Sequence, residues 1–220
     1  MRTFVRNNSL GLAALVLFAL SLGGQIVTGH AEANDDRAAH NEPAIGLSSY
    51  LGSGHFIEAV FENWESEFLQ MAAFVVLTVH LRQKGSPESK PVEGSQPVDA
   101  EPDPRRRRAP WPVRKGGWIL KLYENSLGLT LFALFLLSFG LHAVGGAAEY
   151  NEEQQSHGGT EQVDPLSYIA TNRFWFESLQ NWQSEFMSVG ALVVLSVFLR
   201  QKGSPESKQV DAPHAKTGPG

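Results

Sequence analysis

The sequence contains no cysteine, which excludes disulfides, thiol nucleophiles, thiolate metal sites and iron–sulfur clusters. Charged residues are scarce as well, at 19% of the chain. They lie between four apolar blocks, and this distribution is typical of a membrane protein rather than of a globular core. No phosphate-binding glycine loop, metalloprotease helix motif or Ser-His-Asp arrangement is present. The sequence therefore predicts no enzyme, no cofactor and no metal site.

An internal repeat is the main feature that the sequence does contain. Residues 63–90 return 118 positions later as residues 181–208, and 20 of the 28 aligned positions are identical. Residues 8–32 match residues 125–149 at an offset of 117. Chance and shared composition do not give identity at this level, so the chain carries two copies of one structural unit.

Four apolar segments follow the order of the repeat. They predict helices over residues 8–27, 56–81, 120–144 and 174–199. A membrane-spanning helix needs about 20 apolar residues to cross roughly 30 Å of hydrocarbon. The apolar part of the second and fourth segments is only 14 residues long, so these helices must extend back to Asn63 and Asn181 to span a bilayer. We therefore expect an all-α membrane protein with four transmembrane helices, built as two tandem helical hairpins.

Repeat boundaries and composition divide the chain into four regions. These are a first membrane hairpin, a disordered linker that is basic and Pro-rich, a second membrane hairpin and a disordered tail, at residues 1–90, 91–117, 118–208 and 209–220. Inside the hairpins, the acidic and Gly-containing segments 28–54 and 145–172 are expected to be irregular and solvated.

The first apolar segment has two interpretations. A basic start with Arg2 and Arg6, an apolar run and the small residues Ala31 and Ala33 fit a cleavable signal peptide. The second copy of the same segment lies inside the chain, where it cannot act as an N-terminal signal. We therefore expect the first helix to be retained as a membrane anchor.

Basic residues predict the orientation in the cell membrane. The N-terminus, the linker and the tail hold 16 of the 18 Lys and Arg residues, whereas the segments inside the hairpins hold only Arg37 and Arg173. Basic regions stay on the cytoplasmic side of a membrane. We therefore expect a multi-pass protein with both termini in the cytoplasm and both acidic segments outside.

One helix face keeps its polar character in both copies. It carries Asn63, Ser66, Glu67, Gln70 and Thr78 in the first copy, and Asn181, Ser184, Glu185, Ser188 and Ser196 in the second. A carboxylate within a membrane is costly, and it is therefore a candidate functional group. Glu67 and Glu185, with Asn63, Asn181, Gln70 and Ser188, form a candidate ion or proton site. Alternatively, both glutamates lie at the outer headgroup level and only hold the helices together.

The remaining polar groups give weaker signals. Arg105, Arg106, Arg107 and Arg108 lie before the third apolar segment, where they either contact anionic lipid headgroups or only fix the topology. No folded nucleic-acid-binding module accompanies them, so no nucleic-acid partner is expected. The loop histidines lack the close spacing of zinc ligands and are expected to be solvated; they are His30, His40, His55 and His157.

The repeated motif resembles a known family. Asn-Trp-x-Ser-Glu-Phe at residues 63–68, an apolar helix and Arg-Gln-Lys-Gly-Ser-Pro-Glu-Ser-Lys at residues 82–90 are similar to an uncharacterised family of small bacterial membrane proteins, described only as a domain of unknown function. The resemblance covers residues 7–90 and 124–208. It implies a membrane location and supplies no activity. We expect a helical bundle with a structural or interaction role in the lipid bilayer, and this bundle can be a homo-oligomer. The alternative is a small transporter or channel coupled to protons or cations.

Overall fold

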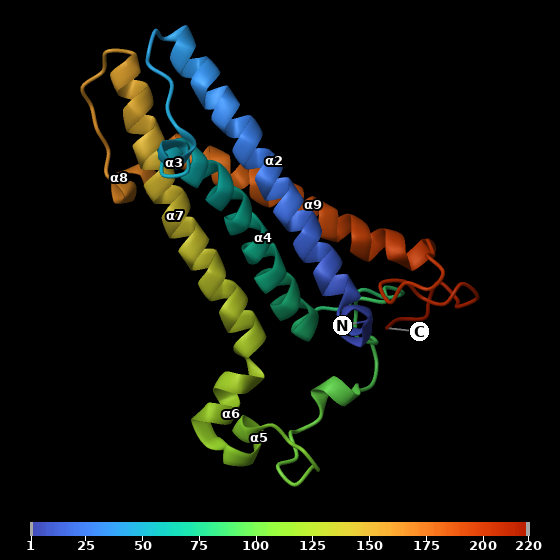
Figure 1. Ribbon diagram of the computed structural model, residues 1–220. Coiled ribbons are helices and arrows are strands. Elements are labelled where there is room, and N and C mark those ends of the chain that lie inside the picture. The colour runs from blue at the N-terminus through green and yellow to red at the C-terminus, as the bar shows by residue number, and fades with distance from the viewer. Residues whose placement is uncertain (1, 219–220) are drawn as a thin grey trace. The chain divides into compact units, whose positions relative to one another are not determined.

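Helices make up all the regular structure that is described. The computed structural model of the chain describes residues 2–218, and no strand occurs in that range. Four helices are long: α2 (Ser9–Ala39), α4 (Gly54–His80), α7 (Ser126–Ser156) and α9 (Asn172–Phe198) (Figure 1). Each covers most of one apolar segment of the sequence, but the helix expected over residues 120–144 is divided, because residues 120–124 belong to α6 (Gly117–Glu124). The expectation of an all-α chain is thus confirmed.

The ends of α2 and α7 differ from the expectation. Both helices are 31 residues long and continue past residues 27 and 144 into the acidic segments that were expected to be irregular. These extensions contain alanine, glutamate and glutamine, which favour helix, and no proline. Helix propensity therefore carries both helices well beyond their apolar parts. The irregular parts of these segments are shorter than predicted.

Within residues 2–218, six short helices accompany the long ones. They are α1 (Arg2–Asn7), α3 (Leu47–Tyr50), the 3-10 helix η1 (Pro97–Asp99), α5 (Trp111–Lys115), α6 (Gly117–Glu124) and α8 (Pro165–Ile169). The linker at residues 91–117 thus contains η1 and α5. Gly116 lies between α5 and α6, and Gly116 and the first residue of α6, Gly117, have φ angles of 68° and 63°. Glycine is the residue that adopts positive φ without a steric penalty, so this pair explains the break between the two helices.

Two of the long helices are apolar enough to cross a membrane. These are α2 and α7, each with an 18-residue window of mean hydropathy 2.1. In α7, 28% of that window is buried, whereas none of the window in α2 is buried. Within the described chain, α4 and α9 do not reach the same measure, which agrees with their shorter apolar parts. The structure therefore has two candidate membrane spans.

The chain forms two compact units. Unit 1 contains the chain up to Phe61 together with Gly140–Phe174. Unit 2 contains Glu62–Phe139 together with the chain from Trp175 onward. Each unit combines segments from both copies of the sequence repeat. Contacts between the two copies therefore contribute to both units.

Glycines allow close helix contacts in unit 1. A Cβ atom at Gly145 in α7 would lie 2.4 Å from the backbone nitrogen of Glu58 in α4, and a Cβ atom at Gly54 would lie 2.4 Å from the backbone nitrogen of Glu149. No larger residue permits such an approach of two backbones, and small residues at helix crossings are typical of membrane proteins. The start of α4 is thereby packed directly on α7.

Two asparagines at equivalent positions of the repeat form hydrogen bonds with the segments that follow α2 and α7. Asn34 exchanges two hydrogen bonds with the backbone of Ile45: its Nδ2 donates to the carbonyl at 3.2 Å, and its Oδ1 accepts from the backbone nitrogen at 2.7 Å. Asn151 exchanges the same two bonds with Val163, at 2.9 and 2.8 Å. Each asparagine satisfies backbone groups that the irregular segment leaves unpaired. The same pair of hydrogen bonds thus occurs at equivalent positions of the sequence repeat.

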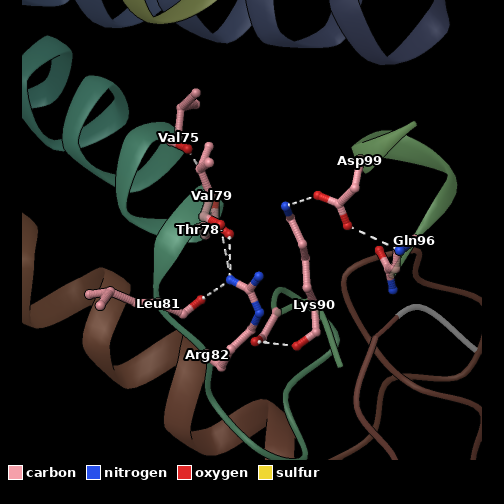
Figure 2. A network of polar contacts seen from close by, with 9 residues as sticks. Val75, Thr78, Val79, Leu81, Arg82, Lys90, Gln96 and Asp99 are labelled. Carbon is pink, nitrogen blue, oxygen red and sulfur yellow. Dashed lines mark hydrogen bonds and ion pairs between the residues drawn. The ribbon is translucent and has the colours of Figure 1, made fainter. Parts of the chain in front are cut away.

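In unit 2, the first residue of the Arg-Gln-Lys-Gly-Ser-Pro-Glu-Ser-Lys motif of each copy caps the C-terminal end of the preceding helix. Arg82 Nη1 donates to the carbonyls of Thr78, Val79 and Leu81, at 3.5, 3.0 and 2.9 Å (Figure 2). Arg200 makes the equivalent bonds after α9, at 3.3, 3.1 and 2.8 Å. Because the last carbonyls of a helix lack partners within it, a guanidinium at this place acts as a C-terminal cap.

The end of the chain is bonded to the first of these motifs. The backbone nitrogen of Gly218 donates to the Ser86 carbonyl at 3.0 Å, and that of Gly85 donates to Thr217 Oγ1 at 2.8 Å. The Lys208 ammonium donates to the carbonyls of His214 and Lys216, at 2.9 and 3.1 Å. Residues 209–218 therefore fold back onto unit 2 through specific contacts.

Candidate functional site

The glutamates of the predicted ion or proton site lie near each other in unit 2. The carboxylates of Glu67 and Glu185 are close enough for their charges to interact. Glu67 is exposed and Glu185 is half-buried. Of the four residues predicted to accompany them, two are exposed and two are half-buried: Asn63 and Ser188, and Gln70 and Asn181. The structure thus brings the two carboxylates together on an accessible face.

The fully buried carboxylate of unit 2 is a different one. Glu65 is 0% exposed, and its Oε1 accepts a hydrogen bond of 2.9 Å from the Trp182 indole nitrogen. The neighbouring Ser66 is also buried. Glu65 does not belong to the polar face that both copies share, and the structure nevertheless buries it. The buried face is decided by the position of Trp182 on the partner helix, which periodicity along α4 does not specify.

A second buried polar group lies in unit 1. The Tyr168 hydroxyl donates to Glu58 Oε1 at 3.2 Å. A carboxylate oxygen of Glu58 lies within 4.8 Å of a ring nitrogen of His142, and the His142 ring stacks on Phe174 with centroids 4.6 Å apart. Glu58 and Glu65 are seven residues apart in α4, which is about two helical turns, so both lie on the same face of the helix. This spacing was the signal in the sequence for a buried face that carries polar residues.

Unit 1 also contains an open cavity of about 650 Å³, which we name the acidic cavity. Its wall is formed by the last turns of α2 and α7, the residues that follow them, and the first residues of α4 and α9. Six carboxylates line it, from Glu32, Asp36, Glu42, Glu149, Glu152 and Glu153. Three imidazoles and two guanidinium groups complete its charged surface, from His40, His55, His157, Arg37 and Arg173. The cavity is therefore strongly polar.

Ion pairs occupy part of this lining. Arg37 pairs with Glu42 at 3.1 Å, and Arg173 pairs with Glu153. His55 Nε2 lies 3.3 Å from a carboxylate oxygen of Glu32. Both guanidinium groups are thus matched by carboxylates of the same wall. The remaining carboxylates give the cavity an excess of negative charge, which favours a cationic ligand.

Equivalent positions of the two copies meet in the acidic cavity. At the offset of 117, Glu32 corresponds to Glu149, Asp36 to Glu153 and His40 to His157. All six side chains line the same wall. The spacing of histidines within each loop does not reveal this set. The available signal was the offset itself, because residues that match between copies can approach each other around an axis that relates the copies.

The basic cluster of the linker lies in unit 2. Arg105, Arg106, Arg107 and Arg108 are all exposed. The backbone nitrogen of Arg105 donates to Asp103 Oδ1 at 2.8 Å, which forms a local turn. Their guanidinium groups are therefore accessible to an anionic surface.

Fold and lining together define an all-helical protein with two helices apolar enough for a membrane and a polar cavity. The chain belongs to the family described as Domain of unknown function (DUF6766), whose model matches residues 1–219. Comparison with curated proteins and with solved structures gives no match to the chain. The expected resemblance to a family of unknown function is thus confirmed.

Proposed function

We propose that the protein is an integral membrane protein that acts as a structural or interaction bundle, with four transmembrane helices in two tandem hairpins. The observation that carries this proposal is the apolar window of α2, of which no part is buried. Its exposed side chains include Leu10, Leu15, Leu17 and Leu20. Removing apolar surface from water is worth about 25 cal/mol per Å², so a helix of this kind is stabilised by hydrocarbon around it.

The shorter spans would be α4 and α9. Each has 27 residues, which corresponds to a helix of about 40 Å and exceeds the hydrocarbon thickness. The C-terminal halves of both helices carry exposed apolar side chains, among them Val76 and Leu77 in α4 and Val194 and Leu195 in α9. The polar N-terminal halves would then lie at the outer headgroup level. Such short apolar spans are accommodated by local thinning of the bilayer.

The orientation follows from charge. Both termini and the basic linker would lie in the cytoplasm, where Arg105–Arg108 are positioned to contact anionic lipid headgroups at about 1 kcal/mol per charge. The acidic ends of α2 and α7 would lie outside. A second copy of the chain is an alternative cover for α2, which would make the protein a homo-oligomer.

Extraction of membranes tests this proposal. Membranes from cells that produce the full chain are washed with alkaline carbonate, which releases peripheral proteins. We expect the protein to stay in the membrane fraction, to dissolve in mild detergent and to have the mass of the whole chain. Release by carbonate would contradict the proposal. A mature start near Asn34 would show that the first helix is a cleaved signal peptide and leave three spans.

A further inference from the structure

We propose that the acidic cavity binds one divalent transition-metal ion through the Nε2 atoms of His40 and His157. The two histidines are 117 residues apart and follow the last turns of α2 and α7. Both belong to unit 1, and both line the cavity. The two histidines share this cavity whatever the number of membrane spans and the orientation of the chain.

Backbone hydrogen bonds fix the tautomer of both rings. His40 Nδ1 lies 3.0 Å from the Asp36 carbonyl oxygen, and His157 Nδ1 lies 2.8 Å from the Glu153 carbonyl oxygen. A carbonyl oxygen only accepts, so each Nδ1 carries a proton, and in the neutral ring the lone pair that a metal requires is on Nε2. Over residues 2–218, neither Nε2 makes a hydrogen bond. Metal-binding histidines typically donate from the other nitrogen to a carbonyl in this way.

The distance between the rings suits one shared ion. Their centroids are 5.9 Å apart, and their planes are inclined by 71°. Two imidazoles that bind one ion through bonds of about 2.0–2.1 Å have centroids roughly 5–6 Å apart. The separation of the two rings therefore permits both Nε2 atoms to bind one ion.

The cavity supplies the charge and the further ligands that an ion requires. Arg37 and Arg173 are paired with Glu42 and Glu153, and the six carboxylates of the wall outnumber these two guanidinium groups. Asp36 and Glu152 line the same space and provide oxygen donors. Two imidazoles select zinc, copper or nickel over calcium and magnesium, which prefer oxygen ligands alone. Zinc is therefore a suitable probe.

Zinc titration of the purified full chain tests the site. The protein is prepared in detergent with a tag that lacks histidine, and Zn²⁺ binding is measured by calorimetry. We expect one equivalent of Zn²⁺ to bind. H40N and H157N should each weaken binding at least tenfold, because loss of an inner ligand exceeds the roughly 10–100-fold effect of losing an outer one. The asparagine amide still donates to the carbonyl four residues earlier, so the helix end is preserved.

The matched control is H214N, since His214 bonds to the backbone carbonyl of Val197 through Nδ1 but lies in unit 2. This variant should bind Zn²⁺ like the parent chain. No Zn²⁺ binding by the parent chain, or equal binding by all three variants, would overturn the proposal. Equally tight binding of Ca²⁺ that ignores H40N and H157N would also overturn it, because it would assign the cavity to oxygen ligands alone.

A spectroscopic measurement on the parent chain makes the test independent of how the variants fold. Electron paramagnetic resonance of the Cu²⁺-loaded protein should show coupling to nitrogen from two imidazoles. A spectrum with oxygen ligands only, or with a single imidazole, would contradict the pairing of His40 with His157.

Discussion

The backbone of Gly145 in α7 lies against the backbone of Glu58 in α4, so that a Cβ atom at Gly145 would lie 2.4 Å from the Glu58 nitrogen. Both groups belong to rigid helices, and neither can move aside by rotating a side chain. We therefore expect Gly145→Ala to destabilise the protein by about 1–3 kcal/mol through overpacking. The apparent Tm in detergent should fall by several degrees, at about 2–4 °C per kcal/mol for a chain of this size.

Gly140→Ala is the matched control for this substitution. Gly140 lies in the same helix, and a Cβ atom there would meet no atom within 4 Å. Alanine favours helix over glycine by about 0.5–1 kcal/mol, so the control should be neutral or slightly stabilising. Equal Tm values for the two variants would show that α4 and α7 do not approach each other at Gly145.

Asn151 should be important for the order of the segment after α7. Its side chain makes both hydrogen bonds to Val163, so Asn151→Ala leaves two backbone groups without their partner and should reduce local stability by about 1–3 kcal/mol. Limited proteolysis by a glutamate-specific protease reports on this, because Glu161 lies between the two bonded residues. We expect faster cleavage after Glu161 in the variant. Asn125→Ala, which removes one exposed bond to the Lys121 carbonyl, should leave that cleavage rate unchanged.

Glu88 gives stability a dependence on pH. Burial, a hydrogen bond with Glu206 and the Glu206 charge raise the pKa of Glu88 to about 7, from an ordinary value of 4.5. The folded chain then binds this proton more tightly than the unfolded chain does. The contribution of Glu88 protonation to the free energy of unfolding is fully present below the ordinary pKa of the carboxyl group, and it is lost as pH rises through about 7.

Thermal unfolding at several pH values measures this contribution. The apparent Tm of the parent chain should fall between about pH 5 and about pH 8, and Glu88→Gln should flatten that slope, because an amide does not titrate. Glu93→Gln, at an exposed position of the same region, serves as the control and should keep the parent slope. A parent slope in the Glu88→Gln variant would assign the pH dependence to other groups.

Cysteine labelling tests the orientation, and the chain has no native cysteine to interfere. Cysteines at Ser95 and Ala212 should be shielded from an impermeant thiol reagent in intact cells. A cysteine at Ser156, at the exposed end of α7, should react. Labelling of Ser95→Cys from outside would invert the proposed orientation.

The double variant E67Q/E185Q separates a structural protein from an ion pathway. Because Glu67 is exposed and its charge meets that of Glu185, removing both charges should leave folding and assembly intact. Gel filtration in detergent and the apparent Tm check this expectation. Proton flux in liposomes that contain the parent chain, and its loss in a folded double variant, would instead support a site at the two carboxylates.

Helix positions were predictable because they depend on local pattern. The apolar segments gave α2, α4, α7 and α9, each near its expected place. The C-terminal ends of α2 and α7 were wrong, since the expectation stopped where the apolar residues stop. Helix propensity continues through Ala39 and Ser156, and it does not require apolar residues. Periodicity therefore located the helices but not the length of their polar extensions.

The buried polar groups were less accessible to such reasoning. A helical wheel shows which residues share a face, but burial depends on what lies opposite that face. Buried Glu65 accepts a hydrogen bond from Trp182, and buried Glu58 accepts one from Tyr168. Neither partner can be identified from α4 alone.

The sequence by itself determined the all-helical class, the two strongly apolar helices and the internal repeat, because each is a property of residues near one another along the chain. Only the tertiary structure decided that His40 and His157 line one cavity, with their ring centroids 5.9 Å apart. Their approach depends on how the residues that follow α2 and α7 are arranged within unit 1. Packing between distant segments is set by side-chain contacts of both partners together, such as the glycine crossing at Gly145, and no local pattern in either segment specifies it.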